Sequence, residues 1–277
     1  MSDPRLTLAR PDLASAGLEG LVRARAYAPT TAMHCASPSA ALRTAPDGAA
    51  EQADQLLFGE GFDVLQVKAG WAWGQARRDG YVGYITLGAL AEGAAAPTHR
   101  VSALRAYGFS GPDIKSAPVG LYSLNALVQV EAREGRFAKA AGSGWFVETQ
   151  LSPIGQFEAD PAAVAEQFLG APYQWGGRES PGLDCSGLVQ QALYACGRAC
   201  PRDTDMQAAM GSPVEASALR RGDLVLWRGH VGMMLDPAQQ EGARMIHANA
   251  HFMATTIEPL AQALERIGPA SAFRRVA

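Results

Sequence analysis

The amino-terminal part of the chain carries short apolar runs that glycines separate at close intervals. Over residues 31–92 these runs are Leu56–Phe58, Val64–Val67, Trp71–Trp73 and Tyr81–Ile85. Short strands bounded by glycine are typical of a small barrel or sandwich. The pattern therefore predicts a small all-β domain over residues 31–92.

Residues 98–152 repeat this pattern. Leu121–Val128 parallels Leu56–Val64, and Gly142–Val147 parallels Gly80–Ile85. Self-similarity of this kind indicates a divergent internal duplication. We therefore predict a second small all-β domain over residues 98–152.

Two further segments flank the predicted β domains. Ala91–Pro97 is rich in alanine and glycine and predicts a linker between them. Residues 1–30 are interpreted as an amino-terminal arm without chemistry of its own. Within this arm, Asp12 is placed to cap a short helix over Leu13–Leu21.

After Ser152–Gly155 the pattern changes to helical spacing and then to strands. Pro161 opens a predicted helix that ends near Leu169, and a second helix over Cys185–Cys196 is followed by the stop residue Gly197. Three apolar runs then predict strands: Leu224–Trp227, Val231–Leu235 and Met245–Ala248. Helices followed by strands predict an α+β domain over residues 158–277.

Composition narrows the classes of function. The chain has 277 residues and a formal net charge of −3, which argues against nucleic acid as a partner because phosphate binding needs a basic face. No apolar run approaches the ~18 residues of a membrane span. The cysteines are too sparse for a disulfide scaffold, and no leader pattern is visible at Met1–Arg10, so we expect a cytoplasmic location.

The sharpest chemical feature is Asp184-Cys185-Ser186-Gly187 at the start of the second helix. A thiolate is the nucleophilic form of cysteine, and the free N–H groups and dipole of a helix start stabilise it. Asp184 stands where a helix cap would stand. The alternative is a small apolar residue buried at a helix start, and the tetrapeptide alone does not separate the two.

A thiol nucleophile needs a base. His230 opens one predicted strand and His247 lies in the next, so antiparallel pairing would place the two imidazoles side by side. One would contact the thiol while the other fixes its orientation and tautomer. For His34, His99 and His251 we expect surface or purely structural roles.

A metal site is the rival interpretation. Cys196 and Cys200, and His247 and His251, have the spacing of zinc-ligand pairs. The gap between the two pairs is far longer than the ~12–15 residues of a compact zinc finger. We therefore expect neither a metal nor a cofactor.

The last part of the chain resembles the NlpC-type cell-wall endopeptidases, which are papain-like cysteine peptidases. Several separated motifs carry the resemblance: Tyr173-Gln174-Trp175-Gly176-Gly177, Asp184–Gln190, Pro201-Arg202-Asp203-Thr204, Arg221–Val225, His230-Val231-Gly232 and Ile246-His247-Ala248. The resemblance implies that Cys185 attacks an amide, that His230 is the base and that His247 orients it. The two β domains then resemble bacterial SH3-like barrels, which gives an α+β papain-like catalytic domain preceded by two small all-β barrels.

Two such barrels before an NlpC-type domain resemble the γ-D-glutamyl-L-diamino acid endopeptidases. The resemblance implies a murein peptide substrate with a free amino-terminal L-Ala, followed by γ-D-Glu and a diamino acid. It also implies substrate contacts, carried over by motif to Tyr173, Asp184, Ser186, Asp203 and Thr204, and from the first barrel to Tyr81 and Glu60. Carboxylates around a buried ammonium would reject a blocked amino terminus.

The sequence thus predicts a cysteine endopeptidase that cleaves the γ-D-Glu–diamino acid bond, either meso-diaminopimelate or L-Lys, in cell-wall recycling. Two alternatives remain. One is a non-catalytic wall-binding protein, and the other is a thiol acyltransferase or amidase that acts on another bond. The presence of Cys185, His230 and His247 argues against the wall-binding protein. Tyr173, Asp184 and Asp203, the residues expected to bind the ammonium group, argue against the acyltransferase or amidase.

Overall fold

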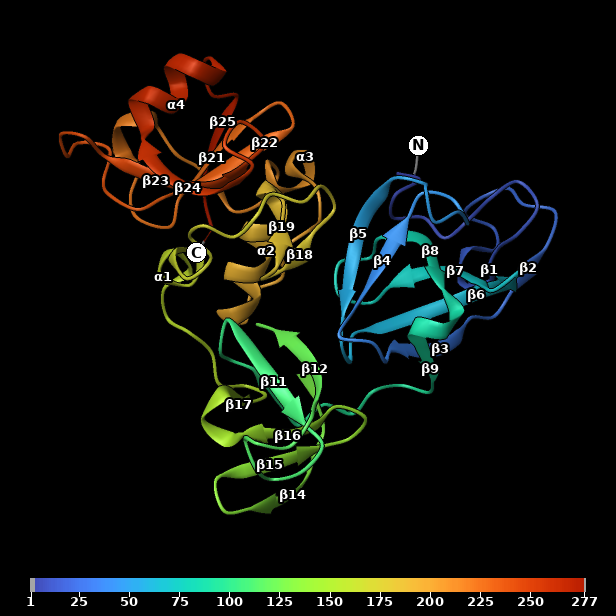
Figure 1. Cartoon of the computed structure of the whole chain (residues 1–277). Coiled ribbons are helices and arrows are strands. Elements are labelled where there is room, and N and C mark those ends of the chain that lie inside the picture. Colours follow the sequence, from blue (N-terminus) through green and yellow to red (C-terminus); the bar gives the residue numbers. More distant parts are fainter. Residues whose placement is uncertain (1–2, 277) are drawn as a thin grey trace. The chain divides into compact units, whose positions relative to one another are not determined.

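The computed structural model describes residues 3–276, which divide into two compact units. The amino-terminal unit ends at Ile154 and the carboxyl-terminal unit begins at Gly155 (Figure 1). No helix in the described range has the length and apolarity needed to cross a bilayer.

The first half of the amino-terminal unit is an antiparallel sheet in the order β5-β4-β8-β7-β6-β3-β9. Its buried positions alternate along the strands, as the period-2 pattern of the sequence requires. The strands are β3 (Thr31–Cys35), β4 (Ser39–Arg43), β5 (Gln52–Leu57), β6 (Gly61–Lys68), β7 (Trp71–Ala76), β8 (Val82–Thr86) and β9 (Leu90–Glu92).

The second half holds an antiparallel sheet β12-β11-β16-β15-β14 and a smaller one, β13-β10-β17. Neither these sheets nor the first one closes into a barrel within residues 3–276. The strands are β10 (His99–Val101), β11 (Arg105–Phe109), β12 (Pro118–Ser123), β13 (Leu127–Val128), β14 (Val130–Glu134), β15 (Phe137–Ala140), β16 (Gly144–Val147) and β17 (Leu151–Pro153).

The two halves repeat one topology. In the first half, the hairpin β4–β5 pairs with β8 through one residue pair, Arg43 with Tyr84. In the second half, the hairpin β11–β12 pairs with β16 through one residue pair, Phe109 with Trp145. A 3₁₀ helix precedes the last strand in both halves, over Leu87–Ala89 before β9 and over Glu148–Gln150 before β17. The predicted duplication is therefore visible in the strand pairing.

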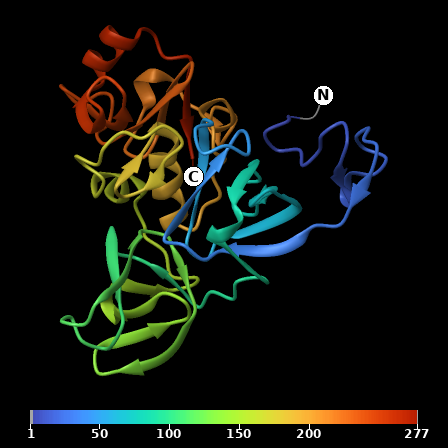
Figure 2. The same ribbon diagram turned by 45° about the vertical axis from the view of Figure 1, so that its right-hand side comes forward.

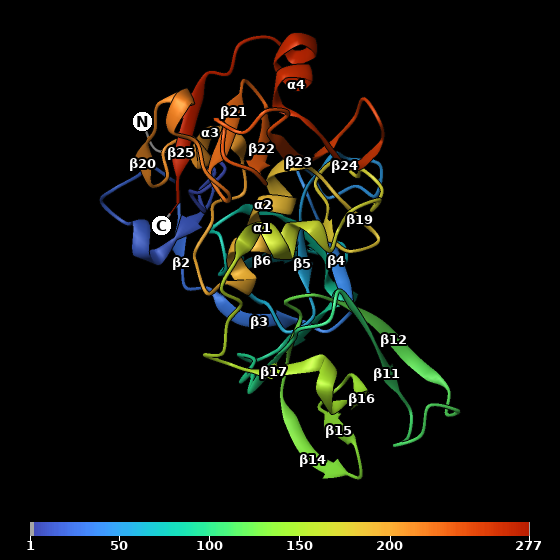
Figure 3. The ribbon, with the colours of Figure 1, turned by 90° about the vertical axis from the view of Figure 1, so that its left-hand side faces the viewer.

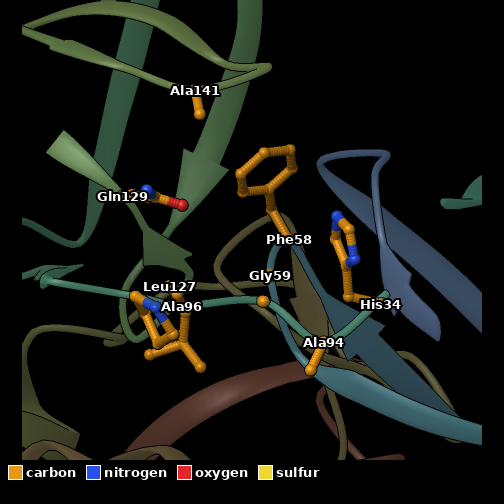
Figure 4. Close-up of a pocket in the computed structure, with 10 residues that line it drawn as sticks. His34, Phe58, Gly59, Ala94, Ala96, Leu127, Gln129 and Ala141 are labelled. Carbon is orange, nitrogen blue, oxygen red and sulfur yellow. The ribbon is translucent and has the colours of Figure 1, made fainter. Parts of the chain in front are cut away.

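A shared core joins the two halves. Phe58 follows β5, yet its ring meets Tyr122 edge-on at 5.2 Å in the cluster of the second half. Gly59 has a φ of +78°, and a Cβ there would lie 2.2 Å from the carbonyl oxygen of Leu127, so only glycine fits. Beside them, a cavity of about 240 Å³ lies under the linker and is lined by His34 and Gln129 among others (Figure 4).

The amino-terminal arm does not contain the helix predicted over Leu13–Leu21. It runs as an irregular loop, dark blue in Figure 2, with a parallel pair β1 (Ala14–Ser15) and β2 (Tyr27–Ala28) and a 3₁₀ turn over Ala16–Leu18. Arg10 anchors the arm, because its guanidinium lies 3.9 Å from the ring centre of Trp73. Packing against the first sheet therefore overrides the local helical pattern.

The carboxyl-terminal unit has the expected α+β composition. Its sheet has the order β20-β25-β21-β22-β23-β24, and α2 and α4 lie on opposite sides of it, with α1 packed against α2 (Figures 1 and 3). The central strands are β21 (Leu224–Trp227), β22 (His230–Met234), β23 (Arg244–Asn249) and β24 (Ala254–Pro259), and the edge strands are β20 (Ser212–Pro213) and β25 (Ala272–Arg275).

Two helices of this unit, α1 and α2, begin at an aspartate whose side chain caps the helix. The side chain of Asp160 accepts a bond from Ala162 N–H at the start of α1 (Pro161–Glu166), which ends before the predicted Leu169. The other elements are α2 (Cys185–Ala195), α3 (Thr204–Gln207), α4 (Leu260–Ile267), a 3₁₀ turn over Ala216–Ala218 and the small hairpin β18 (Arg178–Glu179) with β19 (Gly182–Leu183).

Candidate active site

Cys185 is the first residue of α2. Its predecessor Asp184 is extended, and the Asp184 carboxylate accepts a bond of 2.8 Å from Gly187 N–H, which is the geometry of a helix cap. Cys185 itself is buried, with 6% of its surface exposed. The structure thus places the thiol at a helix start, where backbone N–H groups can stabilise negative charge.

Burial dominates the acidity of this thiol. Removal from water raises the pKa of Cys185 to about 12, and the nearby Asp184 charge adds to the effect. The backbone N–H groups of Val231 and Ser186 act in the opposite direction and lower this pKa. In this geometry the sulfur is a neutral thiol, so a base must take its proton as it attacks.

His230 and His247 lie side by side, as the predicted pairing of their strands requires. His230 Nε2 lies 2.7 Å from His247 Nδ1, and the ring centres are 5.0 Å apart. The loop between their strands is closed by Asp236, whose carboxylate bonds to the backbone and guanidinium of Arg244. Because these bonds hold the two ends of the loop together, β22 and β23 remain paired although the loop between them is long.

Both imidazoles are neutral at pH 7. Burial lowers the pKa of His230 to about 3, with further contributions from the charges of His247 and Arg266. Burial also lowers the pKa of His247 to about 4. A neutral imidazole has a free ring nitrogen that can accept a proton from a neutral thiol.

Sequence reasoning missed a carboxylate next to His247. Glu258 Oε1 lies 2.7 Å from His247 Nε2, and Arg266 of α4 contacts the same oxygen. Glu258 pairs with Met245 across the sheet, two residues from His247, so both side chains share one face. Only strand register shows this neighbour, because no local pattern around Glu258 marks it.

Asp184 has a second partner that the motif did not reveal. The Arg202 guanidinium donates two hydrogen bonds of 2.6 and 3.0 Å to the Asp184 carboxylate. It also donates a hydrogen bond of 2.7 Å to the Ser186 hydroxyl. Gly176 N–H bonds to Asp184 as well. The carboxylate expected to meet a substrate ammonium is therefore already partly neutralised by a buried guanidinium.

The other predicted contacts of this unit lie at the ends of nearby elements. Tyr173 is half-buried, and burial together with the charge of Asp184 raises the pKa of its phenol. Asp203 occupies the cap position of α3 and Thr204 is the first residue of that helix. Both are partly exposed. Their roles toward a substrate stay predictions.

Tyr81 and Glu60 belong to the amino-terminal unit. Tyr81 is buried, with 7% of its surface exposed. Glu60 is buried as well: it pairs with Arg78 at 2.9 Å and accepts a bond of 3.0 Å from Leu57 N–H. These contacts give Glu60 a structural role, and substrate contact by either residue stays a prediction.

The remaining histidines have local contacts. His34 Nδ1 lies 2.9 Å from the carbonyl oxygen of Gly93, His99 contacts Thr98, and His251 meets the ring of Phe252. Within residues 3–276, no group of three or more His, Cys, Asp or Glu residues is arranged to hold a metal.

Family models match two parts of the chain. The model of the NlpC/P60 family matches residues 170–263, and that of the bacterial dipeptidyl-peptidase Sh3 domain matches residues 42–90. A solved structure, an NlpC/P60 family protein from Bacillus cereus ATCC 10987, has a TM-score of 0.76 at 21% identity and covers 88% of this chain and 99% of its own. That likeness shows the fold.

Curated relatives agree with these matches. A probable endopeptidase of Corynebacterium glutamicum (strain R) is 37% identical over 93 residues, which are 30% of this chain and 44% of that protein. The chain spans less than half the length of the curated relatives of this kind. The gamma-D-glutamyl-L-lysine dipeptidyl-peptidase of Bacillus subtilis (strain 168) is 25% identical over 217 residues, which are 70% of this chain and 71% of that protein.

The predicted resemblance is thus confirmed by independent matches to each kind of domain. The papain-like α+β fold extends through the unit that contains Cys185, His230 and His247. Residues 170–263 of the chain thus match the NlpC/P60 family, and residues 42–90, which precede them, match the bacterial dipeptidyl-peptidase Sh3 domain.

Proposed function

We propose that this protein is a cysteine endopeptidase that hydrolyses the γ-D-Glu–diamino acid bond of murein peptides. One observation carries the proposal. The buried thiol of Cys185 lies at a helix start, and Val231, whose N–H lowers its pKa, directly follows His230, while His230 Nε2 lies 2.7 Å from His247 Nδ1. This arrangement supports Cys185 as the nucleophile, His230 as the base and His247 as the orienting group of a cysteine hydrolase.

The chemistry follows from that arrangement. His230 Nδ1, the nitrogen that His247 does not engage, takes the thiol proton as Cys185 sulfur attacks the amide carbon. The Cys185 N–H at the helix start helps to hold the oxyanion. The C–N bond breaks, the amine leaves with the proton from His230, and a thioester remains. Water, deprotonated by His230, then hydrolyses the thioester and regenerates the thiol.

The choice of bond rests on likeness. The Bacillus subtilis relative is named for a γ-D-glutamyl bond, although it is only 25% identical. We propose that Tyr173, Asp184 and Asp203, with Ser186 and Thr204, receive a free amino-terminal L-Ala. Because Arg202 offsets the charge of Asp184, the phenol and Asp203 would carry more of the ammonium recognition. A cytoplasmic role in wall recycling is part of this proposal.

We also propose that residues 98–152 are a second SH3-like domain. The support is that the pairing β12-β11-β16-β15 resembles β5-β4-β8-β7, and that β13-β10-β17 resembles β6-β3-β9. The family model itself covers only the first copy.

Mass spectrometry of L-Ala-γ-D-Glu-meso-diaminopimelate tests the function. We expect the protein to release L-Ala-D-Glu, Cys185→Ala to release none, and the N-acetylated peptide to remain intact. Cleavage of both peptides would keep the peptidase and remove the ammonium recognition. No cleavage by folded, reduced protein would favour the wall-binding or acyl-transfer alternatives.

A further inference from the structure

His247 is buried and has a polar neighbour at each ring nitrogen. On one side, Nδ1 faces His230 Nε2 at 2.7 Å. On the other side, Nε2 lies 2.7 Å from Glu258 Oε1. This short contact does not meet the geometry of a hydrogen bond, so the interaction between the ring and the carboxylate is electrostatic.

These neighbours allow only one distribution of protons when both rings are neutral. A carboxylate accepts hydrogen bonds and cannot donate them, so it favours a proton on His247 Nε2. His247 Nδ1 is then a lone pair and must accept from His230 Nε2–H. Because a neutral imidazole carries one proton, His230 Nδ1 is left unprotonated.

Arg266 keeps this arrangement in place. Its guanidinium contacts the Glu258 carboxylate and places a positive charge beside it. Arg266 lies on α4, and Glu258 lies on β24, which leads directly into α4. The charged groups around the histidine pair are thus Glu258 and Arg266.

We infer that Glu258, held by Arg266, is a positioning residue that sets the tautomers of both histidines and leaves His230 Nδ1 free to act as the base. The inference deepens the proposed function and rests on it for the role of His230. It makes a separate claim about proton positions, which can be measured without substrate.

The direct test is ¹⁵N NMR of the histidine side chains of the full chain at pH 7.5. We expect the wild-type protein to show His230 and His247 each protonated at Nε2. In Glu258→Gln the amide can donate to His247 Nε2, so we expect His247 to shift toward the Nδ1–H form. Wild-type protein with His247 protonated at Nδ1 would overturn the inference, whatever the variants do.

Kinetics supply the second readout. We expect Glu258→Gln to lower kcat by about ten- to a hundred-fold, the usual effect of losing an outer partner of a functional histidine, with KM little changed. Glu258→Asp should recover part of the loss. Glu265→Gln removes the same charge from an exposed position of α4 and should leave kcat unchanged.

The outcomes separate the two hypotheses. If no peptide is cleaved but the tautomers are as expected, the proposed function fails and the positioning role stands. If the peptide is cleaved and Glu258→Gln retains wild-type kcat and tautomers, the positioning role fails. Should Glu258→Gln not fold, as judged by circular dichroism, the wild-type spectrum and Glu258→Asp still decide the question.

Discussion

At the scale of single residues, the site depends on charges that are buried in pairs. Asp184 caps α2 beside the nucleophile, and Arg202, with 1% of its side chain exposed, holds both carboxylate oxygens. Pairing of this kind adds little net stability, but removing one partner leaves an uncompensated buried charge. The pair therefore fixes the helix start that carries Cys185.

We predict that Arg202→Met destabilises the carboxyl-terminal unit by about 3–5 kcal/mol, the usual result of breaking a buried ion pair. Arg244→Met is the matched control, since its side chain is 52% exposed and its pair with Asp236 should be worth about 0–1 kcal/mol. Urea denaturation of both variants measures the difference. Equal losses would show that the Asp184–Arg202 pair is not a structural requirement.

The site residues also show how far sequence reasoning reaches. Cys185 could be placed at a helix start because the cap Asp184 and the apolar face of α2 are local signals. Glu258 and the pairing of Arg202 with Asp184 could not be found, because they depend on strand register and on a loop. No local pattern marks Glu258, and the motif that contains Arg202 does not reveal its partner.

At the scale of elements, glycine and apolar spacing predicted β5 to β8 and β21 to β23 but not β3, β4, β24 or β25, and tertiary packing decided where a prediction failed. The helix expected over Leu13–Leu21 does not form, since Leu8, Trp73 and the arm pack together in one cluster. Contacts between residues so distant in sequence are invisible to a periodicity argument. The repeated topology was visible because both copies keep their strand and turn signals.

The junction of the repeated halves gives an element-scale prediction. Gly59 and Gly70 have nearly the same φ, +78° and +79°, but only Gly59 would place a Cβ against backbone, the carbonyl of Leu127. Gly70→Ala should cost about 1–2 kcal/mol for the left-handed conformation alone. Gly59→Ala should cost distinctly more, because Leu127 must also move.

Thermal unfolding of the two glycine variants, followed by circular dichroism, makes this comparison. A larger fall in Tm for Gly59→Ala would show that the close approach between the halves stabilises the amino-terminal unit. Equal shifts in Tm would mean that Leu127 can move without loss of stability and that the contact between the halves does not stabilise the amino-terminal unit.

At the scale of the whole molecule, the buried histidine pair links the site to the stability of the fold. His230 and His247 have folded-state pKa values of about 3 and about 4, whereas histidine in an unfolded chain has a pKa near 6.5. Below pH 6.5 the unfolded chain therefore binds more protons than the folded chain, so stability rises with pH across this window.

We predict that the free energy of unfolding falls steadily as the pH drops from 6.5 toward 4. Asp160 and Asp236, whose pKa values are lowered from 3.8, add to this loss only near and below pH 4. Urea denaturation between pH 4.5 and 7.5 measures the slope, which should flatten in His230→Asn and in His247→Asn and stay unchanged in His251→Asn, at an exposed position. If the slope is the same in all variants, the pair is not buried in neutral form, and the neutral thiol and imidazole of the proposed reaction must be replaced by an ion pair.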